Sequence, residues 1–256
     1  MPVVEKMLEM VGVEARDVVY DLGCGDGRIV IAAAKRHGVK AVGIDIDPVR
    51  ISESNDNAAK ANLGGKVRFI QQDLFEADFR EATVVTMYLL TSVNLRLRPK
   101  LLAELKPGTR LVSHTFDMGE WKPDKTSLVA TSHNDQRVVH FWIVPANVTG
   151  RWAWDLRDGR RNEHYTLQAS QQFQDVTASG AEGDWPLAVA DVELAGDRIK
   201  FRVDAETDGE MRSFLYEGTV VGDMIRGTVR LADNPKANAL AWKAARDPQT
   251  VETIAK

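Results

Sequence analysis

The chain has 256 residues, 44% of them hydrophobic, and a formal net charge of −4 at pH 7. This composition supplies enough apolar material for packed cores in one large domain or two smaller ones, and it excludes a disordered chain. Acidic residues equal basic residues in number in the first half and outnumber them in the second, so we expect no nucleic acid partner.

Helical patterns alternate with apolar, strand-like runs over roughly the first 146 residues. The predicted helices cover residues 3–12, 28–38, 48–64 and 95–108. The predicted strands cover residues 17–23, 40–47, 66–73, 82–90 and 109–116. Residues 127–134 and 137–145 form two more strand-like runs with no helix between them, which predicts an antiparallel hairpin at one edge. The fold expected is α/β, with a Rossmann-like, seven-stranded, mostly parallel sheet covered by helices.

The pattern changes after residue 146 to short segments with a period of two. The predicted strands cover residues 150–157, 164–173, 187–196, 198–206, 213–223, 224–232 and 240–247. Gly196-Asp197 and Gly222-Asp223 are typical hairpin turns. These features predict a small antiparallel barrel or sandwich, and Gly150-Arg151-Trp152 resembles the start of lipocalin-like barrels. We therefore expect two domains, residues 1–146 and residues 147–256.

A glycine-rich turn, Asp21-Leu22-Gly23-Cys24-Gly25-Asp26-Gly27, follows the first predicted strand. A dinucleotide-binding turn that begins at Gly23 needs a third glycine where this chain has Arg28. Asp21 would repel a pyrophosphate, but its carboxylate can accept a hydrogen bond from a cationic amino group. The turn therefore favours a ligand with an ammonium group, such as S-adenosylmethionine, over a dinucleotide.

Two further acidic residues close the next two predicted strands. Asp45 ends the second strand, where a carboxylate can accept both hydroxyls of a ribose, and Asp73 ends the third, where it can accept from an adenine amino group. Ligands of open parallel sheets bind in the crevice at this edge. The predicted cofactor site consists of Asp21, Gly23, Gly25, Gly27, Asp45, Ile46, Asp73 and Leu74.

The segments at residues 18–34, 41–48 and 67–75 resemble the first three motifs of class I S-adenosylmethionine-dependent methyltransferases. Residues 21–30 and 88–124 are similar, more narrowly, to the small protein-lysine methyltransferases that act on the mitochondrial ATP synthase c subunit and the adenine nucleotide translocase. The resemblance implies an enzyme that uses S-adenosyl-L-methionine and transfers its methyl group directly, in line, to a nucleophile, which we take to be a protein lysine amine.

The acceptor side is expected beyond the fourth and fifth strands. The candidates there are Tyr88, Leu89, Leu90, Thr91, Asn94, His114, Phe116 and Trp121. We predict catalytic roles for Tyr88, Thr91 and His114. His114 is either a general base or a plain hydrogen-bonding residue, and Tyr88 either orients the acceptor or is a packed aromatic. The histidines show no metal-ligand spacing, so no metal is expected.

This chain also departs from the lysine methyltransferases that it resembles. It has no membrane-embedded N-terminal segment, it adds the predicted barrel, and Met1-Pro2 begins at or inside the stretch that usually precedes the first helix, so part of that stretch is expected to be missing. Two alternatives stay open: a small-molecule N-, O- or S-methyltransferase whose barrel shapes the acceptor pocket, and a non-catalytic scaffold that binds the cofactor.

The number of cysteines and the hydropathy of the chain indicate in which cellular compartment the protein is expected. Cys24 is the only cysteine, which excludes an internal disulfide. No run of about 18 uncharged apolar residues occurs, and the sequence does not begin with the features of a secretory signal. We expect a cytoplasmic protein without a membrane segment in this chain, and the sequence predicts no oligomeric state.

Overall fold

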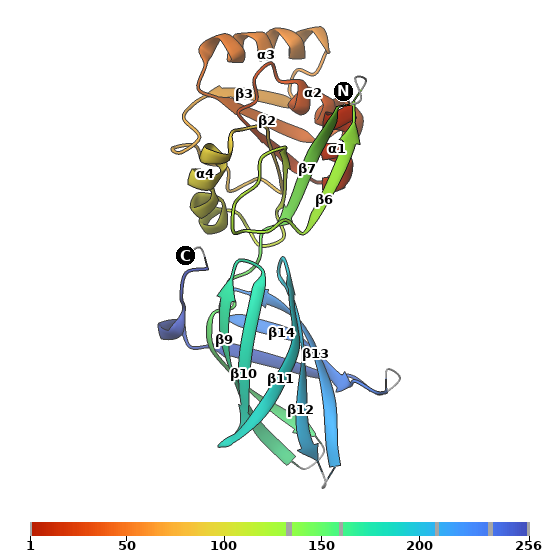
Figure 1. Ribbon diagram of the computed structural model, residues 1–256, viewed down its shortest axis with the longest axis vertical. Helices are drawn as coiled ribbons and strands as arrows, with labels where there is room; N and C mark the ends of the chain where they lie inside the picture. Colours follow the sequence, from red (N-terminus) through yellow and green to blue (C-terminus); the bar gives the residue numbers. More distant parts are fainter. Residues whose placement is uncertain (1, 132–134, 159–160, 208–209, 235–237, 255–256) are drawn as a thin grey trace. The chain divides into compact units, whose positions relative to one another are not determined.

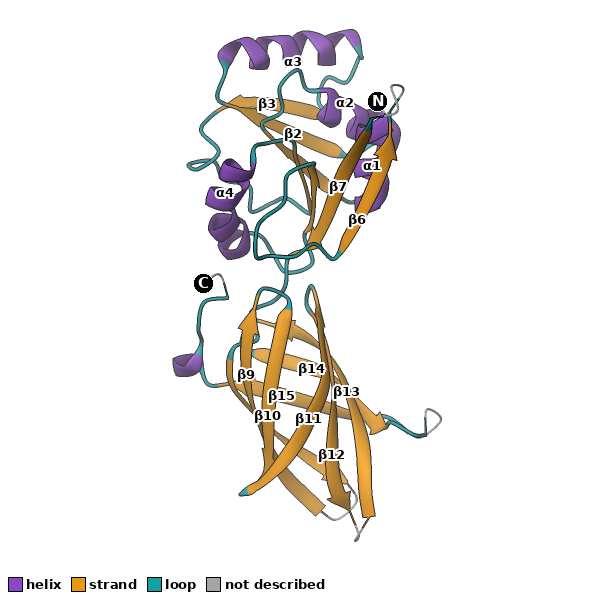
Figure 2. Cartoon of the chain, viewed as in Figure 1, coloured by secondary structure: helices purple, strands orange, loops and turns teal. Residues whose placement is uncertain are grey.

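The computed structural model describes residues 2–131, 135–158, 161–207, 210–234 and 238–254 (Figure 1). The chain divides into two compact units, Met1–Val144 and Pro145–Lys256. Helices occur mainly in the first unit, and the second consists almost entirely of strands (Figure 2).

The first unit is a sheet of seven strands in the order β3-β2-β1-β4-β5-β7-β6. Its strands are β1 (Val18–Leu22), β2 (Lys40–Asp45), β3 (Val67–Gln71), β4 (Val84–Met87), β5 (Arg110–His114), β6 (Lys125–Ala130) and β7 (Gln136–Ile143). Its helices are α1 (Pro2–Val11), α2 (Arg28–His37), α3 (Pro48–Lys60) and α4 (Thr91–Glu104). β1 to β5 pair in parallel, whereas β7 is antiparallel to both β5 and β6. The predicted mostly parallel sheet with an antiparallel edge hairpin is confirmed.

Apolar periodicity accounts for how helix α1 packs. Its buried residues, Val4, Met7, Leu8 and Val11, follow the i, i+3, i+4, i+7 spacing of one helix face. This face shares a core with buried residues of α2 and with Val19, Val84, Val112 and Val139 of the sheet. Because the central strands are buried on both faces, they consist of almost unbroken apolar runs. Among the described helices, none is both long and apolar enough to cross a membrane.

The sheet order places a ligand crevice between β1 and β4. The chain builds outwards from β1 to β2 and β3 on one side, and from β4 to β5 on the other. The carboxyl ends of parallel strands meet at one edge of the sheet, and open α/β sheets bind ligands there, at the point where the strand order reverses.

The second unit is a closed antiparallel barrel of eight strands. They are β8 (Gly150–Asp158), β9 (Arg161–Gln172), β10 (Asp175–Glu182), β11 (Trp185–Ala195), β12 (Arg198–Thr207), β13 (Glu210–Val221), β14 (Met224–Leu231) and β15 (Leu240–Arg246). A short 3₁₀-helix, η1 (Pro248–Thr250), follows them. β15 pairs with β8, β8 with β9 and β9 with β10, which closes the ring. Of the two predicted forms, barrel and sandwich, the structure shows the barrel.

Aromatic side chains fill part of the barrel interior. Phe201 and Tyr216 stack with their ring centroids 5.0 Å apart, and Trp242 meets Tyr216 edge to face at 5.1 Å. Trp154 lies 5.3 Å from Trp242, centroid to centroid. All four are buried, so this part of the interior is a packed core, which small barrels typically form.

Apart from shifts of a few residues at the ends of other elements, three details differ from the sequence prediction. Strand β10 was not predicted, because its centre, Ala178 to Ala181, has none of the β-branched or aromatic residues that mark strands. Helix α4 begins at Thr91 rather than residue 95 and ends at Glu104. Strand β6 ends at Ala130, and residues 132–134 of the predicted run lie outside the described residues.

Candidate functional site

The glycine-rich turn after β1 lines a cavity of about 390 Å³. Gly23, Gly25 and Gly27 all have a positive φ, at 76°, 54° and 77°, which residues with a side chain rarely adopt. A Cβ on Gly23 would lie 2.4 Å from Leu89 Cδ2, and one on Gly27 would lie 2.7 Å from Phe69 Cζ. A Cβ on Gly25 would meet no atom within 4 Å, so the backbone at Gly25 is open to a close approach by a ligand.

Helix α3 holds this turn through two side chains that the sequence analysis did not single out. Ser54 Oγ donates to the carbonyl oxygen of Gly25 at 2.7 Å, and Asn57 Nδ2 donates to that of Asp26 at 3.0 Å. The signal in the sequence is weak: two small polar residues, three apart, on a predicted helix. Only the fold shows that they face the turn.

Asp21 is a buried carboxylate at the end of β1, and only 1% of its surface is exposed. Thr86 Oγ1 donates a hydrogen bond to Asp21 Oδ1 at 2.6 Å. Burial above all, together with the nearby charges of Asp45 and Asp26, raises the pKa of Asp21 to about 7, against the lowering effect of this hydrogen bond. The cavity therefore presents a costly negative charge that a cationic ligand group would stabilise.

Cys24 lines the same cavity but is not suited to chemistry. Its side chain packs under the turn, where a Cβ on Gly43 would lie 2.8 Å from Cys24 Sγ. Burial above all, together with the charges of Asp21 and Asp45, raises the pKa of the Cys24 thiol to about 12. The thiol therefore stays protonated and unreactive near neutral pH.

Asp45 ties the end of β2 to the turn. Its Oδ2 accepts from the backbone N–H of Gly25 at 2.9 Å, and its Oδ1 accepts from the N–H of Asp47 at 3.0 Å. Each oxygen keeps acceptor capacity for a ligand hydroxyl. Ile46, the next residue, is 66% exposed, so its apolar side chain is open to a ligand.

Asp73 and Leu74 follow β3 and are half-buried. Asp73 Oδ1 accepts from the N–H of Phe75 at 2.9 Å, and the Asp73 carbonyl accepts from the N–H groups of Glu76 and Ala77. Much of the hydrogen-bonding capacity of Asp73 thus shapes its own turn. Neither Asp73 nor Leu74 lines the cavity at the glycine turn.

The acceptor-side candidates lie after β4 and β5. Tyr88 is 57% exposed and lines the cavity, and its ring meets that of His114 edge to face, with centroids 4.1 Å apart. His114 is only 3% exposed, and burial lowers its pKa, with a further lowering by Arg137. Thr91 is exposed as the first residue of α4 and does not line the cavity.

A tight turn that follows His114 is held by Asn94 of α4. Thr115 has a φ of 68°, which is a strained conformation for a β-branched residue. The N–H of Phe116 donates to the carbonyl of His114 at 2.8 Å and closes the turn. The fully buried Asn94 donates from Nδ2 to Phe116 O at 3.1 Å and to Ser113 Oγ at 3.3 Å. Asn94 Oδ1 and His114 Nδ1 are buried without a hydrogen-bond partner among the described residues.

The cavity brings together four residues of the predicted site: Asp21, Gly23, Gly25 and Tyr88. Its walls also include Asp26, Arg28 and Arg50, which the prediction did not assign. Arg28 makes a paired contact with Asp26, with Nη2 2.7 Å from Oδ2. Phe116 lies in the turn after His114, and Trp121 is fully buried, with its carbonyl accepting from Trp142 Nε1 at 2.9 Å.

The chemistry of these residues fits S-adenosylmethionine. That cofactor carries an ammonium and a sulfonium, and the cavity offers a buried carboxylate with two further acids nearby. The open face at Gly25 admits a ligand against the backbone, and Asp45 offers acceptors beside it. The described residues contain no cluster of His, Cys, Asp or Glu arranged to hold a metal ion.

Comparisons with known proteins agree with this chemistry. Residues 21–125 match the ANTKMT methyltransferase domain family. The chain is 48% identical over 143 residues to a protein-lysine N-methyltransferase of Saccharolobus islandicus, an alignment that covers 56% of this chain and 88% of that protein. It is 35% identical over 173 residues to the Mus musculus lysine N-methyltransferase of the ATP synthase c subunit, and this alignment covers 65% of this chain and 63% of the mouse protein.

A solved structure is similar as well. It is described as an RNA methyltransferase from Salinibacter ruber in complex with S-adenosyl-L-homocysteine, and it is 52% identical to this chain with a TM-score of 0.54. The similarity covers 57% of this chain and 93% of that one. Its bound S-adenosyl-L-homocysteine is what S-adenosylmethionine becomes after methyl transfer.

Proposed function

This chain belongs to the family of S-adenosylmethionine-dependent protein-lysine methyltransferases, and from this premise we propose that its first unit methylates a lysine side chain of a protein. The observation that carries the proposal is the buried carboxyl group of Asp21 in the cavity at the glycine turn, in a chain 48% identical to a protein-lysine methyltransferase. We take residues 1–146 as the methyltransferase domain and residues 147–256 as a separate barrel domain.

In the proposed arrangement, Asp21 holds the cationic methionine end of the cofactor and the glycine turn supports it through the backbone. Asp45 accepts from the ribose hydroxyls, and Ile46, Asp73 and Leu74 receive the adenine. When bound, the cofactor supplies a methyl group already activated by a sulfonium. The protein therefore has to align the acceptor amine in line with the methyl group and exclude water.

The acceptor amine has to reach the methyl group without its proton. His114 suits this task, because its lowered pKa keeps the imidazole neutral and able to accept a proton at pH 7. Tyr88 lies between the cavity, which it lines, and the His114 ring, which it contacts, so it can orient the amine. Thr91 offers an exposed hydroxyl at the start of α4.

Transfer of a labelled methyl group tests this proposal. The full chain is incubated with methyl-labelled S-adenosylmethionine and a cell lysate, and the labelled fraction is then treated with protease or with ribonuclease. We expect the label in protein, on lysine by mass spectrometry. Label in a filterable small molecule, or no transfer despite cofactor binding, would contradict a protein-lysine acceptor.

RNA is a second candidate acceptor, favoured by the 52% identity to the structure described as an RNA methyltransferase. The balance of charge speaks against it, because neither half of the chain has a basic excess. The ribonuclease arm separates the two acceptors: release of the label by ribonuclease but not by protease would establish RNA and refute the lysine proposal.

A further inference from the structure

Four outward residues of the barrel lie in one row across neighbouring strands. The register pairs Arg198 on β12 with Thr219 on β13. It also pairs Thr219 with Arg226 on β14, and Arg226 with Lys243 on β15. The residues that alternate with them along the strands are buried: Ile199, Val220, Ile225 and Ala244. We call these four outward residues the cation row, and it spans about 14 Å, or three strand spacings.

The cations of this row differ from the other cations nearby. Lys200 lies 3.7 Å from Glu193, Arg202 lies 2.9 Å from Asp191, and Arg230 lies 3.5 Å from Glu217, each as an ion pair. In contrast, none of the three cations in the cation row has an ion-pair partner among the residues that the structure describes. All three side chains are exposed.

Two of these cations are placed against each other. Arg226 and Lys243 are directly opposite on adjacent antiparallel strands, and like charges in such positions repel. Lysine and arginine often protect the free edge of a sheet from aggregation, but a closed barrel has no free edge. Protection of an edge therefore does not explain these cations.

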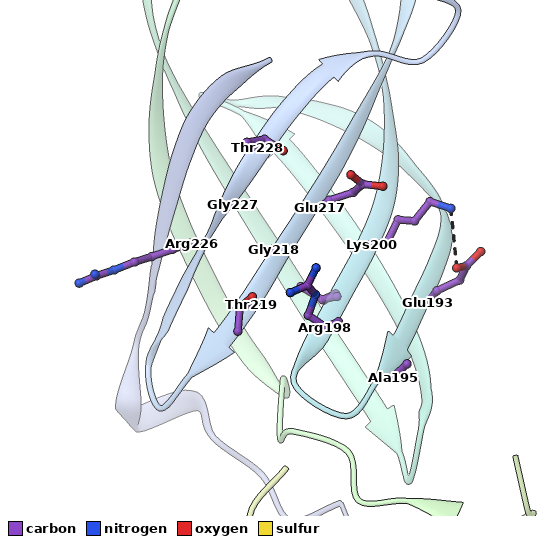
Figure 3. A pocket seen from close by; sticks show the side chains of 11 residues that line it. Glu193, Ala195, Arg198, Lys200, Glu217, Gly218, Thr219, Arg226, Gly227 and Thr228 are labelled. Atoms are coloured by element: carbon purple, nitrogen blue, oxygen red, sulfur yellow. Dashed lines mark ion pairs between the residues drawn. The ribbon is translucent and has the colours of Figure 1, made fainter. Parts of the chain in front are cut away.

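A hollow of about 400 Å³ lies along the cation row. Arg198, Thr219 and Arg226 line it, together with Thr228 and the backbone of Gly218 and Gly227 (Figure 3). Gly218 and Gly227 are cross-strand partners, and a Cβ on Gly227 would collide with the carbonyl of Glu217. The hollow thus places the Thr219 hydroxyl near the Arg198 guanidinium, whereas the Arg226 side chain extends outward from the barrel, away from the hollow (Figure 3).

We propose that the cation row docks an acidic segment of a partner protein. A carboxylate placed between Arg226 and Lys243 would pair with both and remove their mutual repulsion. A second carboxylate would pair with Arg198, whose planar guanidinium matches a carboxylate with two parallel hydrogen bonds. Thr219 and Thr228 can donate to the same oxygens. The proposal goes beyond methyl transfer and does not depend on it.

A short acidic segment fits better than a nucleic acid. Single strands bind to basic grooves that also present aromatic side chains for base stacking, and the cation row has none. The neighbouring row alternates in charge, because Glu193 and Glu217 lie on either side of Lys200, so the cations do not continue into the long basic track that a polyanion would follow. Acidic residues also outnumber basic ones in the second half of the chain.

Binding of a fluorescent peptide of twelve glutamates to the full chain tests the proposal by anisotropy. The variant Arg198→Gln/Arg226→Gln/Lys243→Gln removes the three cations. The control variant Arg151→Gln/Arg157→Gln/Arg212→Gln changes the net charge equally outside the row, at two exposed positions and at Arg212, which is half-buried and pairs with Glu210. We expect the first variant to bind about tenfold more weakly, because it loses three exposed ion pairs, and the control to bind about as the unchanged chain does.

Three results would overturn the proposal. Equal weakening in both triple variants would mean that net charge alone attracts the peptide, and absence of binding even at about 50 mM NaCl would mean that the row docks no acidic segment. Tighter, row-dependent binding of a twelve-nucleotide RNA or of phosphatidylserine vesicles would assign the row to a different class of partner. Circular dichroism melts of both variants show whether the barrel stays folded.

Discussion

Replacement of Asp21 by asparagine should make the ligand-free protein more stable at high pH. The pKa of Asp21 is about 7 in the folded protein, whereas a carboxyl group in an unfolded chain has a pKa of about 3.9. Below pH 4 the group is protonated in both states and contributes nothing. As the pH rises from 4 to 7 the unfolded state releases the proton first, so the free energy of unfolding falls, and above pH 7 the loss is constant.

The size of the effect follows from the two pKa values. At 1.36 kcal/mol for each pH unit, Asp21 costs about 2 kcal/mol at pH 5.5, where the folded protein still holds its proton, and about 4 kcal/mol at pH 8.5, where it is ionised in both states. The variant Asp21→Asn keeps an acceptor for Thr86 and has no charge, but its amide group adds a cost of its own. This cost is independent of pH, so the gain in stability should be about 2 kcal/mol larger at pH 8.5 than at pH 5.5.

Urea unfolding of both proteins at the two pH values measures this difference, and calorimetry with S-adenosylhomocysteine adds a second readout. Binding to the unchanged protein should tighten from pH 6 to pH 8 as Asp21 ionises, and binding to Asp21→Asn should be weaker and less dependent on pH. If the variant changes stability equally at both pH values, Asp21 does not carry a raised pKa and its charge is not costly in the cavity.

Three other changes test the rest of the site. Asp45→Ala should weaken S-adenosylhomocysteine binding by about 1.5 to 3 kcal/mol, measured by calorimetry, and unchanged affinity would refute the ribose placement. Asn94→Ala removes the donors that hold the turn after His114, so it should lower the free energy of unfolding in urea by about 1 to 3 kcal/mol. It should also lower kcat with little effect on the KM of the cofactor. An unaltered kcat would show that the turn does not position His114. At saturating S-adenosylmethionine, where the ionisation of Asp21 no longer limits cofactor binding, kcat should fall below pH 6.5 as His114 gains a proton, and His114→Asn should lack this limb of the pH profile.

The features that the sequence predicted well are local ones. The glycine turn is specified by residues adjacent in sequence, and its three positive φ values need glycine, so the motif alone indicates its conformation. The alternation of helices and strands likewise indicates a parallel sheet, because an unbroken apolar run is typical of a strand that is buried on both faces. Strand β10 was missed because its alanine, serine and glycine residues fit the barrel without showing the composition of a strand.

The features that could not be predicted depend on contacts between distant segments. Ser54 reaches Gly25 across 29 positions, and Asn94 reaches Phe116 across 22, so neither contact leaves a pattern within one helix or strand. The cation row is of the same kind. Arg198, Arg226 and Lys243 have no significance in sequence until the register of four strands aligns them.

Three departures from stable local structure in the first unit lie at the same edge of its sheet. Asp21 is a buried acid directly before the glycine turn, and Thr115 has a positive φ just after β5. Leu90 is the N-cap residue of α4, and its side chain makes no capping hydrogen bond to the helix. Each costs stability, by about 1 to 3 kcal/mol for strained backbone and about 0.5 to 2 kcal/mol for a lost cap. Costs of this kind persist where function needs them, and here they surround the place where a cationic methyl donor and an uncharged amine would meet.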